Sequence, residues 1–222
     1  MPFIDARNLE KKYGEKDAVV HALRSSSFEI ASGEFVGIMG ESGSGKSTLL
    51  SIMGAMNSPS GGSYTVDGLD VYSLDQDQRA DFRREYIGFI FQSFHLIPYL
   101  SLVENVMLPL ITLKTGRKEK RLMALDALSK VGLKDKHHRL PNQVSGGEQE
   151  RAAIARAIVN KPPVILADEP TGNLDSRTAT DIMCRLKDLN ESGITIIMVT
   201  HSKEYAPYLD SILHMSDGVV MT

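Results

Sequence analysis

Three stretches of the chain have the pattern of buried strands. Residues 164–167 and 194–199 are unbroken apolar runs separated by a helical stretch at about residues 177–190, which is typical of parallel strands covered on both faces. Residues 34–39 form a further apolar strand, followed by a glycine-rich loop and a helix predicted to begin near Lys46. In such α/β sheets, chemistry gathers at the carboxyl ends of the strands.

The stretches outside these strands have other periodicities. Residues 3–30 read as short strands with turns, and residues 64–66 before Asp67-Gly68 repeat that character, which predicts an antiparallel β layer. Residues 93–160 are typical of helices, and Gly132 stands where one helix could stop. The apolar positions at helical spacing in this stretch are Leu122, Leu125, Leu128 and Val131. The whole pattern predicts an α/β core with a mostly parallel sheet, an antiparallel β subdomain and an inserted helical subdomain.

Composition and charge narrow the functional classes. The 222 residues are 42% hydrophobic and carry 25 Lys+Arg against 28 Asp+Glu, so no overall basic field attracts nucleic acid or an anionic membrane. We therefore expect a compact globular unit with no nucleic-acid partner. The basic cluster at residues 114–121 is interpreted as the solvated start of a helix.

The number of cysteines and the hydropathy of the sequence indicate the cellular compartment in which the protein works. Cys184 is the single cysteine, and the first residues carry an early acid, Asp5, without a long apolar segment. No run approaches the roughly 18 consecutive apolar residues of a membrane span. We expect the reducing cytosol, with any membrane role supplied by a partner.

A phosphate-binding loop follows the strand at residues 34–39. Its sequence fits G-x-x-x-x-G-K-[ST], in which glycines let successive backbone N–H groups turn toward a phosphate chain. Lys46 is expected to reach the β and γ phosphates, and the Ser47 hydroxyl to ligate Mg²⁺. The expected cradle comprises Gly40, Glu41, Ser42, Gly43, Ser44, Gly45, Lys46, Ser47 and Thr48. This loop alone leaves kinases, GTPases and many motors open.

Two adjacent carboxylates end the strand at residues 164–167. Asp168 and Glu169 project to opposite sides of an extended chain, so one can serve a metal while the other has a separate task. Asp168 is assigned to the Mg²⁺ shell, through water. Glu169 is assigned as the general base that orients the attacking water beside the γ phosphate. The alternative is that both merely cap the helix after Pro170.

Two further polar residues follow neighbouring strands. His201 comes after the strand at residues 194–199, so it shares a sheet edge with Asp168 and can contact the γ phosphate and the water. Gln92 closes a strand at residues 86–91, and its amide oxygen is available to Mg²⁺ or to the attacking water. Both are candidate catalytic residues.

The segment Ser145-Gly146-Gly147-Glu148-Gln149 resembles the signature motif of ABC ATPases and precedes Asp168-Glu169 as in that family. The resemblance covers essentially the whole chain. It is carried, in order, by Tyr13, the phosphate-binding loop, Gln92, the signature, Asp168-Glu169, Asn173-Leu174-Asp175 and His201. It implies one ABC ATPase domain over residues 1–222, with a core of about residues 1–92 and 161–222 and a helical subdomain at 93–160.

The resemblance also implies roles that the residues alone do not give. Tyr13 would stack on adenine, and Asp175 would belong to a loop beside the nucleotide. Ser145, Gly146, Gly147 and Glu148 would face the γ phosphate of ATP held by a second copy, with Ser145 and Glu148 in a capping box. Two chains would then close head to tail around two ATP molecules and Mg²⁺, and hydrolysis would reopen them.

The family further implies an integral membrane permease as partner, which would hold the chain at the inner face of the cell membrane. Its docking groove would lie in residues 93–100, although core packing is the alternative for about half of the apolar side chains there. These are Phe94, Leu96, Ile97, Tyr99 and Leu100. Residues 169–175 and 91–110 are most similar to the lipoprotein-releasing, macrolide-export and cell-division group. Val144, Glu150 and Ser202 depart from the usual pattern.

Two competing functions have distinguishable sequence signs. A soluble ABC ATPase that remodels nucleic acid or ribosomes usually carries two cassettes, a coiled coil or zinc sites, and none is visible in this sequence. A module that binds ATP only as a dimerisation switch would lack Glu169 or His201, and both are present. The sequence therefore favours a transport-coupled ATPase.

Overall fold

A computed structural model of the chain describes residues 2–14 and 19–221. Its central sheet has the strand order β10-β9-β3-β8-β7-β6. Neighbouring strands are parallel from β9 to β6, and β10 is antiparallel to β9. The strands are β3 (Phe35–Gly40), β6 (Ile87–Ile90), β7 (Val164–Asp168), β8 (Thr195–Val199), β9 (Ser211–Ser216) and β10 (Val219–Met221). The mostly parallel sheet is confirmed.

A second, antiparallel sheet has the order β2-β1-β4-β5. Its strands are β1 (Ile4–Tyr13), β2 (Val20–Ile30), β4 (Gly61–Val66) and β5 (Leu69–Asp70). The antiparallel layer is confirmed, but the prediction of short strands with turns in residues 3–30 is wrong. Residues 4–13 and 20–30 form two long paired strands. Register shifts after Ala6, Leu9 and Lys11 interrupt the alternation that a regular long strand would show.

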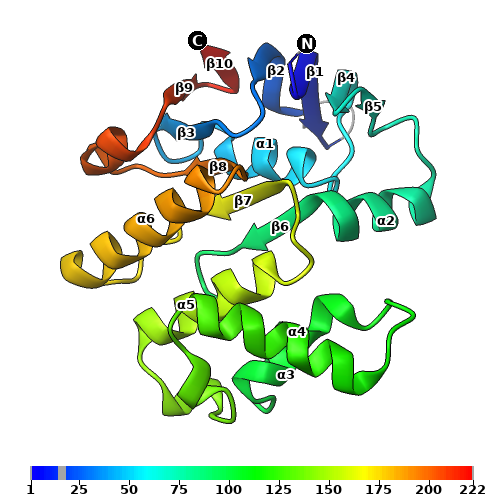
Figure 1. Cartoon of the computed structure of the whole chain (residues 1–222). Coiled ribbons are helices and arrows are strands. Elements are labelled where there is room, and N and C mark those ends of the chain that lie inside the picture. The colour runs from blue at the N-terminus through cyan, green and yellow to red at the C-terminus, as the bar shows by residue number, and fades with distance from the viewer. Residues whose placement is uncertain (1, 15–18, 222) are drawn as a thin grey trace.

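Figure 1 shows the helices in two groups. The first group packs near the sheets: α1 (Lys46–Met53), α2 (Gln76–Tyr86) and α6 (Ser176–Glu191). The second gathers at the end of the molecule opposite β1 and β2: α3 (Leu102–Met107), α4 (Arg117–Lys130) and α5 (Gly146–Ile158). Short 3₁₀ turns occupy residues Leu108–Leu110, Lys134–Lys136, Pro141–Gln143 and Lys203–Tyr208. Within the described residues, no helix is long and apolar enough to cross a membrane.

The central sheet is buried on both faces, as its apolar strands predict. In β7, Val164 and Leu166 pack into a core shared with α1 and the antiparallel sheet, whereas Ile165 and Ala167 pack into a core shared with α3 to α6. The same alternation holds along β8. Because both faces are covered, the polar side chains that follow these strands collect at the sheet's carboxyl edge.

Three of the four predicted apolar positions face the core of the helical group: Leu128 and Val131 are buried in it, and Leu125 packs against it. Leu128 is fully buried together with Ala124 and Ala127, whereas Leu122 is 59% exposed. The helix ends at Lys130, and Gly132 follows with φ +73°, so the predicted stop is confirmed. The basic cluster is exposed and leads into α4 at Arg117, as interpreted.

Replacing Leu128 with alanine should lower the free energy of unfolding by about 2–5 kcal/mol, because it leaves a cavity in the second core. Leu122→Ala in the same helix is the matched control and should change it by less than about 0.5 kcal/mol. Urea denaturation followed by circular dichroism measures both. Equal losses would contradict this placement of the buried face of α4.

One acidic side chain lies inside this second core region. Glu150 of α5 is 0% exposed, and both carboxylate oxygens lack a hydrogen-bond partner among the described residues. Burial raises the pKa of the Glu150 carboxyl to about 8, against a smaller lowering by the positive charge of Arg156. The group is therefore largely protonated at neutral pH in the folded chain.

This burial predicts a specific pH dependence of stability. The folded pKa of Glu150 lies above its ordinary value of 4.5, so between these values the unfolded chain releases a proton that the folded chain keeps. The contribution of Glu150 to the free energy of unfolding is greatest below pH 4.5. It falls by up to about 1.4 kcal/mol per pH unit as pH rises from there toward the folded pKa. In urea denaturation at pH values from 5 to 8, the free energy of unfolding of Glu150→Gln should rise relative to that of the unaltered chain as pH increases. Exposed Glu191→Gln is the control for charge removal, and parallel profiles for Glu150→Gln would refute the prediction.

Candidate functional site

The predicted phosphate-binding loop connects β3 to α1, and its backbone lies where side chains would not fit. A Cβ added at Gly40 would come 2.0 Å from the Met215 carbonyl oxygen, and one at Gly45 would come 2.3 Å from the Ala22 carbonyl oxygen. Gly45 also has φ +101° and directly precedes α1. Glycine is therefore required at both positions, and the loop opens toward the N-terminus of α1.

The polar side chains of this loop have unused hydrogen-bonding capacity. The Lys46 ammonium donates to the carbonyl oxygens of Gly40 and Glu41, at 2.9 and 2.7 Å, which leaves one of its three donors free. The buried Ser44 hydroxyl has no partner among the described residues. Of these two groups, the Lys46 ammonium lines the cavity over the loop and can donate to an anion there.

A cavity of about 510 Å³ opens over this loop. The predicted site residues that line it are Gly40, Ser42, Gly43, Gly45, Lys46, Ser47, Thr48, Glu169 and His201. Sequence reasoning missed Val20, His21 and Ala22 at the start of β2, which also line it. They reach it because Arg24 of β2 donates its backbone N–H to the Gly218 carbonyl beside β10, and no local pattern signals this long-range contact.

Three predicted catalytic residues meet at the edge of this cavity. The Glu169 carboxylate accepts a hydrogen bond from the Gln92 amide at 3.2 Å, and its other oxygen lies 3.3 Å from Nδ1 of His201. Glu169 has φ +46°, a strained value for glutamate, and its backbone N–H donates to the Val199 carbonyl at 3.0 Å. The strand ends of β6, β7 and β8 therefore bring together residues that are far apart in sequence.

Asp168 lies next to this group at the end of β7. Burial raises the pKa of its carboxyl, and the neighbouring charge of Glu169 raises it further, whereas a hydrogen bond with Ser47 and the charge of Lys46 lower it. The alternative that Asp168 and Glu169 cap the next helix is wrong, because α6 begins at Ser176 and its cap is Asp175, which accepts from the Thr178 N–H at 3.0 Å. Neither carboxylate therefore caps α6.

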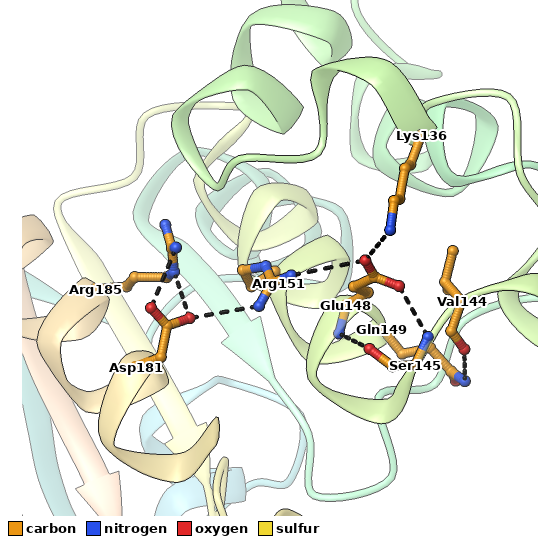
Figure 2. Close-up of polar contacts among 8 residues, drawn as sticks. All are labelled: Lys136, Val144, Ser145, Glu148, Gln149, Arg151, Asp181 and Arg185. Carbon is orange, nitrogen blue, oxygen red and sulfur yellow. Dashed lines mark hydrogen bonds and ion pairs between the residues drawn. The ribbon is translucent and has the colours of Figure 1, made fainter. Parts of the chain in front are cut away.

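The signature segment forms the N-terminus of α5. Ser145 accepts from the Glu148 N–H and Glu148 accepts from the Ser145 N–H, at 3.3 and 2.9 Å, so the predicted capping box is confirmed. The Glu148 carboxylate also bonds Lys136 and lies 3.9 Å from Arg151. Figure 2 shows this network continuing through Arg151 to Asp181 of α6. The hydrogen bond from Lys136 is the first cause that holds the pKa of Glu148 below its ordinary value.

Close packing joins the signature to the start of α6. A Cβ at Gly147 would come 2.4 Å from the Thr178 methyl carbon, and Thr178 is itself bonded to Asp175. The two capped helix ends therefore lie against each other. Sequence reasoning did not find this contact, although the paired glycines of the signature are consistent with a close approach.

Several predicted site residues do not line the cavity. They are Tyr13, Glu41, Ser44, Gln92, Asp168, Ser145, Gly146, Gly147, Glu148 and Asp175. Gln92 and Asp168 adjoin it through Glu169, whereas the signature and Asp175 form a separate surface. Tyr13 is part-exposed at the end of β1, with its hydroxyl bonded by Asn57 and the Lys11 ammonium 4.9 Å from its ring centroid.

Comparison with known proteins identifies relatives of this arrangement. The family model described as ABC transporter matches residues 23–172. The chain is 47% identical over 218 residues to the uncharacterized ABC transporter ATP-binding protein MJ1508 of Methanocaldococcus jannaschii, covering 98% of this chain and 97% of that one. It is 46% identical to the macrolide export ATP-binding/permease protein MacB of Chlorobium luteolum, over all of this chain. The chain spans 33% of the length of that MacB protein.

Solved structures of ABC transporter cassettes also resemble this chain. The dimeric cassette MJ0796 superposes with a TM-score of 0.90 at 45% identity, over 99% of this chain and 97% of that chain. The cassette cbiO1 of Clostridium perfringens superposes with a TM-score of 0.88 at 29% identity, over 100% of this chain and 87% of that chain. With a family match over most of its length and near-full-length relatives of this identity, the chain belongs to the ABC transporter family, as an ABC-type ATPase.

Proposed function

We propose that the chain binds ATP with Mg²⁺ in the cavity over the β3–α1 loop and hydrolyses the γ phosphate. The observation that carries this proposal is the meeting of Gln92, Glu169 and His201 at the edge of that cavity. Their amide, carboxylate and imidazole can orient a water molecule and hold its proton while a phosphate occupies the loop.

The loop is suited to the phosphate chain. Its glycines let the backbone approach the carbonyl groups of Met215 and Ala22, where a Cβ would clash. The free donor of Lys46 and the amides at the start of α1 supply positive potential there. Phosphate oxygens in this space would satisfy groups that are otherwise incompletely bonded.

The residues beside the loop also fit a magnesium ion. Ser47, Asp168 and the amide oxygen of Gln92 supply the hard oxygen ligands that Mg²⁺ prefers, with phosphate oxygens and water completing the shell. Burial, and then the neighbouring charge of Glu169, raise the pKa of the Asp168 carboxyl. A divalent cation beside this carboxyl would stabilise its charged form. Bound magnesium would neutralise charge that develops on the phosphate oxygens.

Glu169 is the proposed general base. One of its oxygens is bonded by Gln92 and the other lies beside His201, so the carboxylate is oriented before substrate arrives. In the reaction, Glu169 would accept a hydrogen bond from the attacking water and receive its proton. Gln92 and His201 would keep the carboxylate and the water in line with the phosphorus–oxygen bond that breaks.

The complete site is proposed to require a second copy of the chain. Ser145 is exposed at the N-terminus of α5, yet the signature lines no part of the cavity of its own chain. A head-to-tail dimer would bring the Ser145 and Gly146 amides of each chain to the γ phosphate in the other. The relative MJ0796 is described as dimeric, and another structure of it as a post-hydrolysis state bound to ADP and Pi, which supports this proposal.

The energy of hydrolysis is proposed to drive an integral membrane partner that holds the chain at the cytoplasmic face of the cell membrane. The proposed helical subdomain, residues 93–160, offers a surface for it: Tyr99 is 78% exposed, and a cavity of about 310 Å³ lies between Leu100 and Ile111. The MacB relatives are described as export ATP-binding/permease proteins and cbiO1 as part of the cbiONQ transporter complex. The MacB name favours an export-type system, and the cbiO1 title supports assembly with separate transporter components.

Lys46→Ala should weaken ATP binding at least tenfold and abolish most hydrolysis, because it removes the cation from the loop. Titration calorimetry and phosphate release measure the two effects. Lys130→Ala is the matched control, because Lys130 is an exposed lysine of α4 that pairs with Asp126, and it should leave both values unchanged. Unchanged ATP affinity in Lys46→Ala would contradict the assignment of the loop.

Glu169→Gln should form a stable dimer with ATP and Mg²⁺, because the amide keeps the shape of the side chain but cannot accept the proton. Size-exclusion chromatography should show the dimer with ATP and the monomer with ADP. Adding Ser145→Arg to this variant should prevent the dimer while ATP still binds. If Glu169→Gln stays monomeric with ATP bound, the homodimer is withdrawn for the isolated chain.

A further inference from the structure

The segment that follows Gln92 is held by one side chain of α5. The Arg156 guanidinium donates to the carbonyl oxygen of Phe94 at 2.6 Å and to that of His95 through its other terminal nitrogen. Planar, forked donors of this kind fix two acceptors at once. Arg156 thereby ties the signature helix to the chain two and three residues beyond Gln92.

The backbone at these two residues needs such support. Phe94 and His95 have φ of +60° and +47°, and consecutive left-handed positions without glycine persist only where neighbouring groups determine them. The turn directs both carbonyls toward α5, where Arg156 meets them. On the other side, the Asn173 amide donates to the Gln92 carbonyl at 2.9 Å. The segment is thus fixed at both ends.

The surroundings of Arg156 fit a side chain that bonds backbone carbonyl groups and does not take part in an ion pair. Among residues 2–14 and 19–221, Arg156 forms no salt bridge, whereas Arg151 of the same helix pairs with Asp181. The nearby Glu150 is buried and largely protonated at neutral pH. A part-buried guanidinium whose hydrogen-bond partners are two backbone carbonyls is stabilised by them, and in return it fixes their positions.

We infer that Arg156 is a positioning residue for Gln92: it holds the turn at Phe94 and His95 so that the Gln92 amide reaches Glu169. This inference rests on the proposed ATPase function and deepens it. The contacts run from Arg156 to the carbonyls of Phe94 and His95, and along the backbone to Gln92. They end at the 3.2 Å hydrogen bond from Gln92 to Glu169. Because α5 begins with the signature and carries Arg156 three turns later, the placement of this helix sets the placement of Gln92.

A double-mutant cycle on the full chain tests this inference. Steady-state hydrolysis of Mg-ATP is measured for Arg156→Ala, Gln92→Ala and the double variant. We expect Arg156→Ala to lower kcat on the order of 10- to 100-fold, the range that misplacement of a reacting group causes, with KM for ATP changed less than about threefold. The double variant should equal Gln92→Ala within about twofold, because both changes remove the same function. Arg156→Lys, which can bond one carbonyl, should recover part of kcat.

Arg185→Ala is the control, since Arg185 of α6 pairs with Asp181 and touches no part of this segment; its effect should multiply with that of Gln92→Ala. If the effects of Arg156→Ala and Gln92→Ala multiply, or if kcat of Arg156→Ala is unchanged, the inference is overturned while the proposed function stands. If Gln92→Ala itself hydrolyses normally, the proposed role of Gln92 fails together with the inference. Should Arg156→Ala not fold, Arg156→Lys carries the same cycle.

Discussion

The structure depends on the close approach of three backbone segments around the β3–α1 loop. The Met215 carbonyl lies where a Cβ of Gly40 would be, and the Ala22 carbonyl where a Cβ of Gly45 would be. The loop therefore lies between β2 of the antiparallel sheet and β9 of the central sheet. Six residues of this loop and of the start of α1 also line an open cavity: Ser42, Gly43, Gly45, Lys46, Ser47 and Thr48. One steric constraint therefore links the assembly of the two sheets to the formation of the anion site.

A second constraint acts at the end of β7, where Glu169 is held in a left-handed conformation. Its backbone N–H bonds Val199, and its carboxylate is bonded from the ends of β6 and β8. These neighbours belong to, or directly follow, the two strands that pair with β7. The strain is thus sustained by the sheet itself, and the result is a carboxylate with a fixed orientation. Such preorganisation is what an acid–base group needs when water is the nucleophile.

Sequence patterns anticipated those parts of the molecule whose signals are local. The apolar runs gave β7 and β8, the loop motif gave the geometry of residues 40–48, and the capping box gave the start of α5. Long-range contacts carry no such signal. The approach of Val20, His21 and Ala22 to the cavity depends on how β2 meets β10. Leu122 has the helical spacing of the buried positions of α4 but is 59% exposed. The length of β1 and β2 was missed because bulges disturb the period of two.

Helix α5 shows why the signature segment is more than a loop that faces a partner. Its first turn packs on α6 through Gly147 and Thr178, its second buries Glu150, and its third holds the turn after Gln92 through Arg156. Any force on the exposed Ser145 end would act on a rigid element that is fixed at all three places. The same helix that would contact a neighbour's nucleotide is therefore bonded, within its own chain, to the segment that orients Glu169. The signature segment and the cavity edge at Glu169 are separate on the surface of a single chain, but both are linked to α5. Helix α5 therefore gives a physical route by which closure of a dimer could be coupled to hydrolysis.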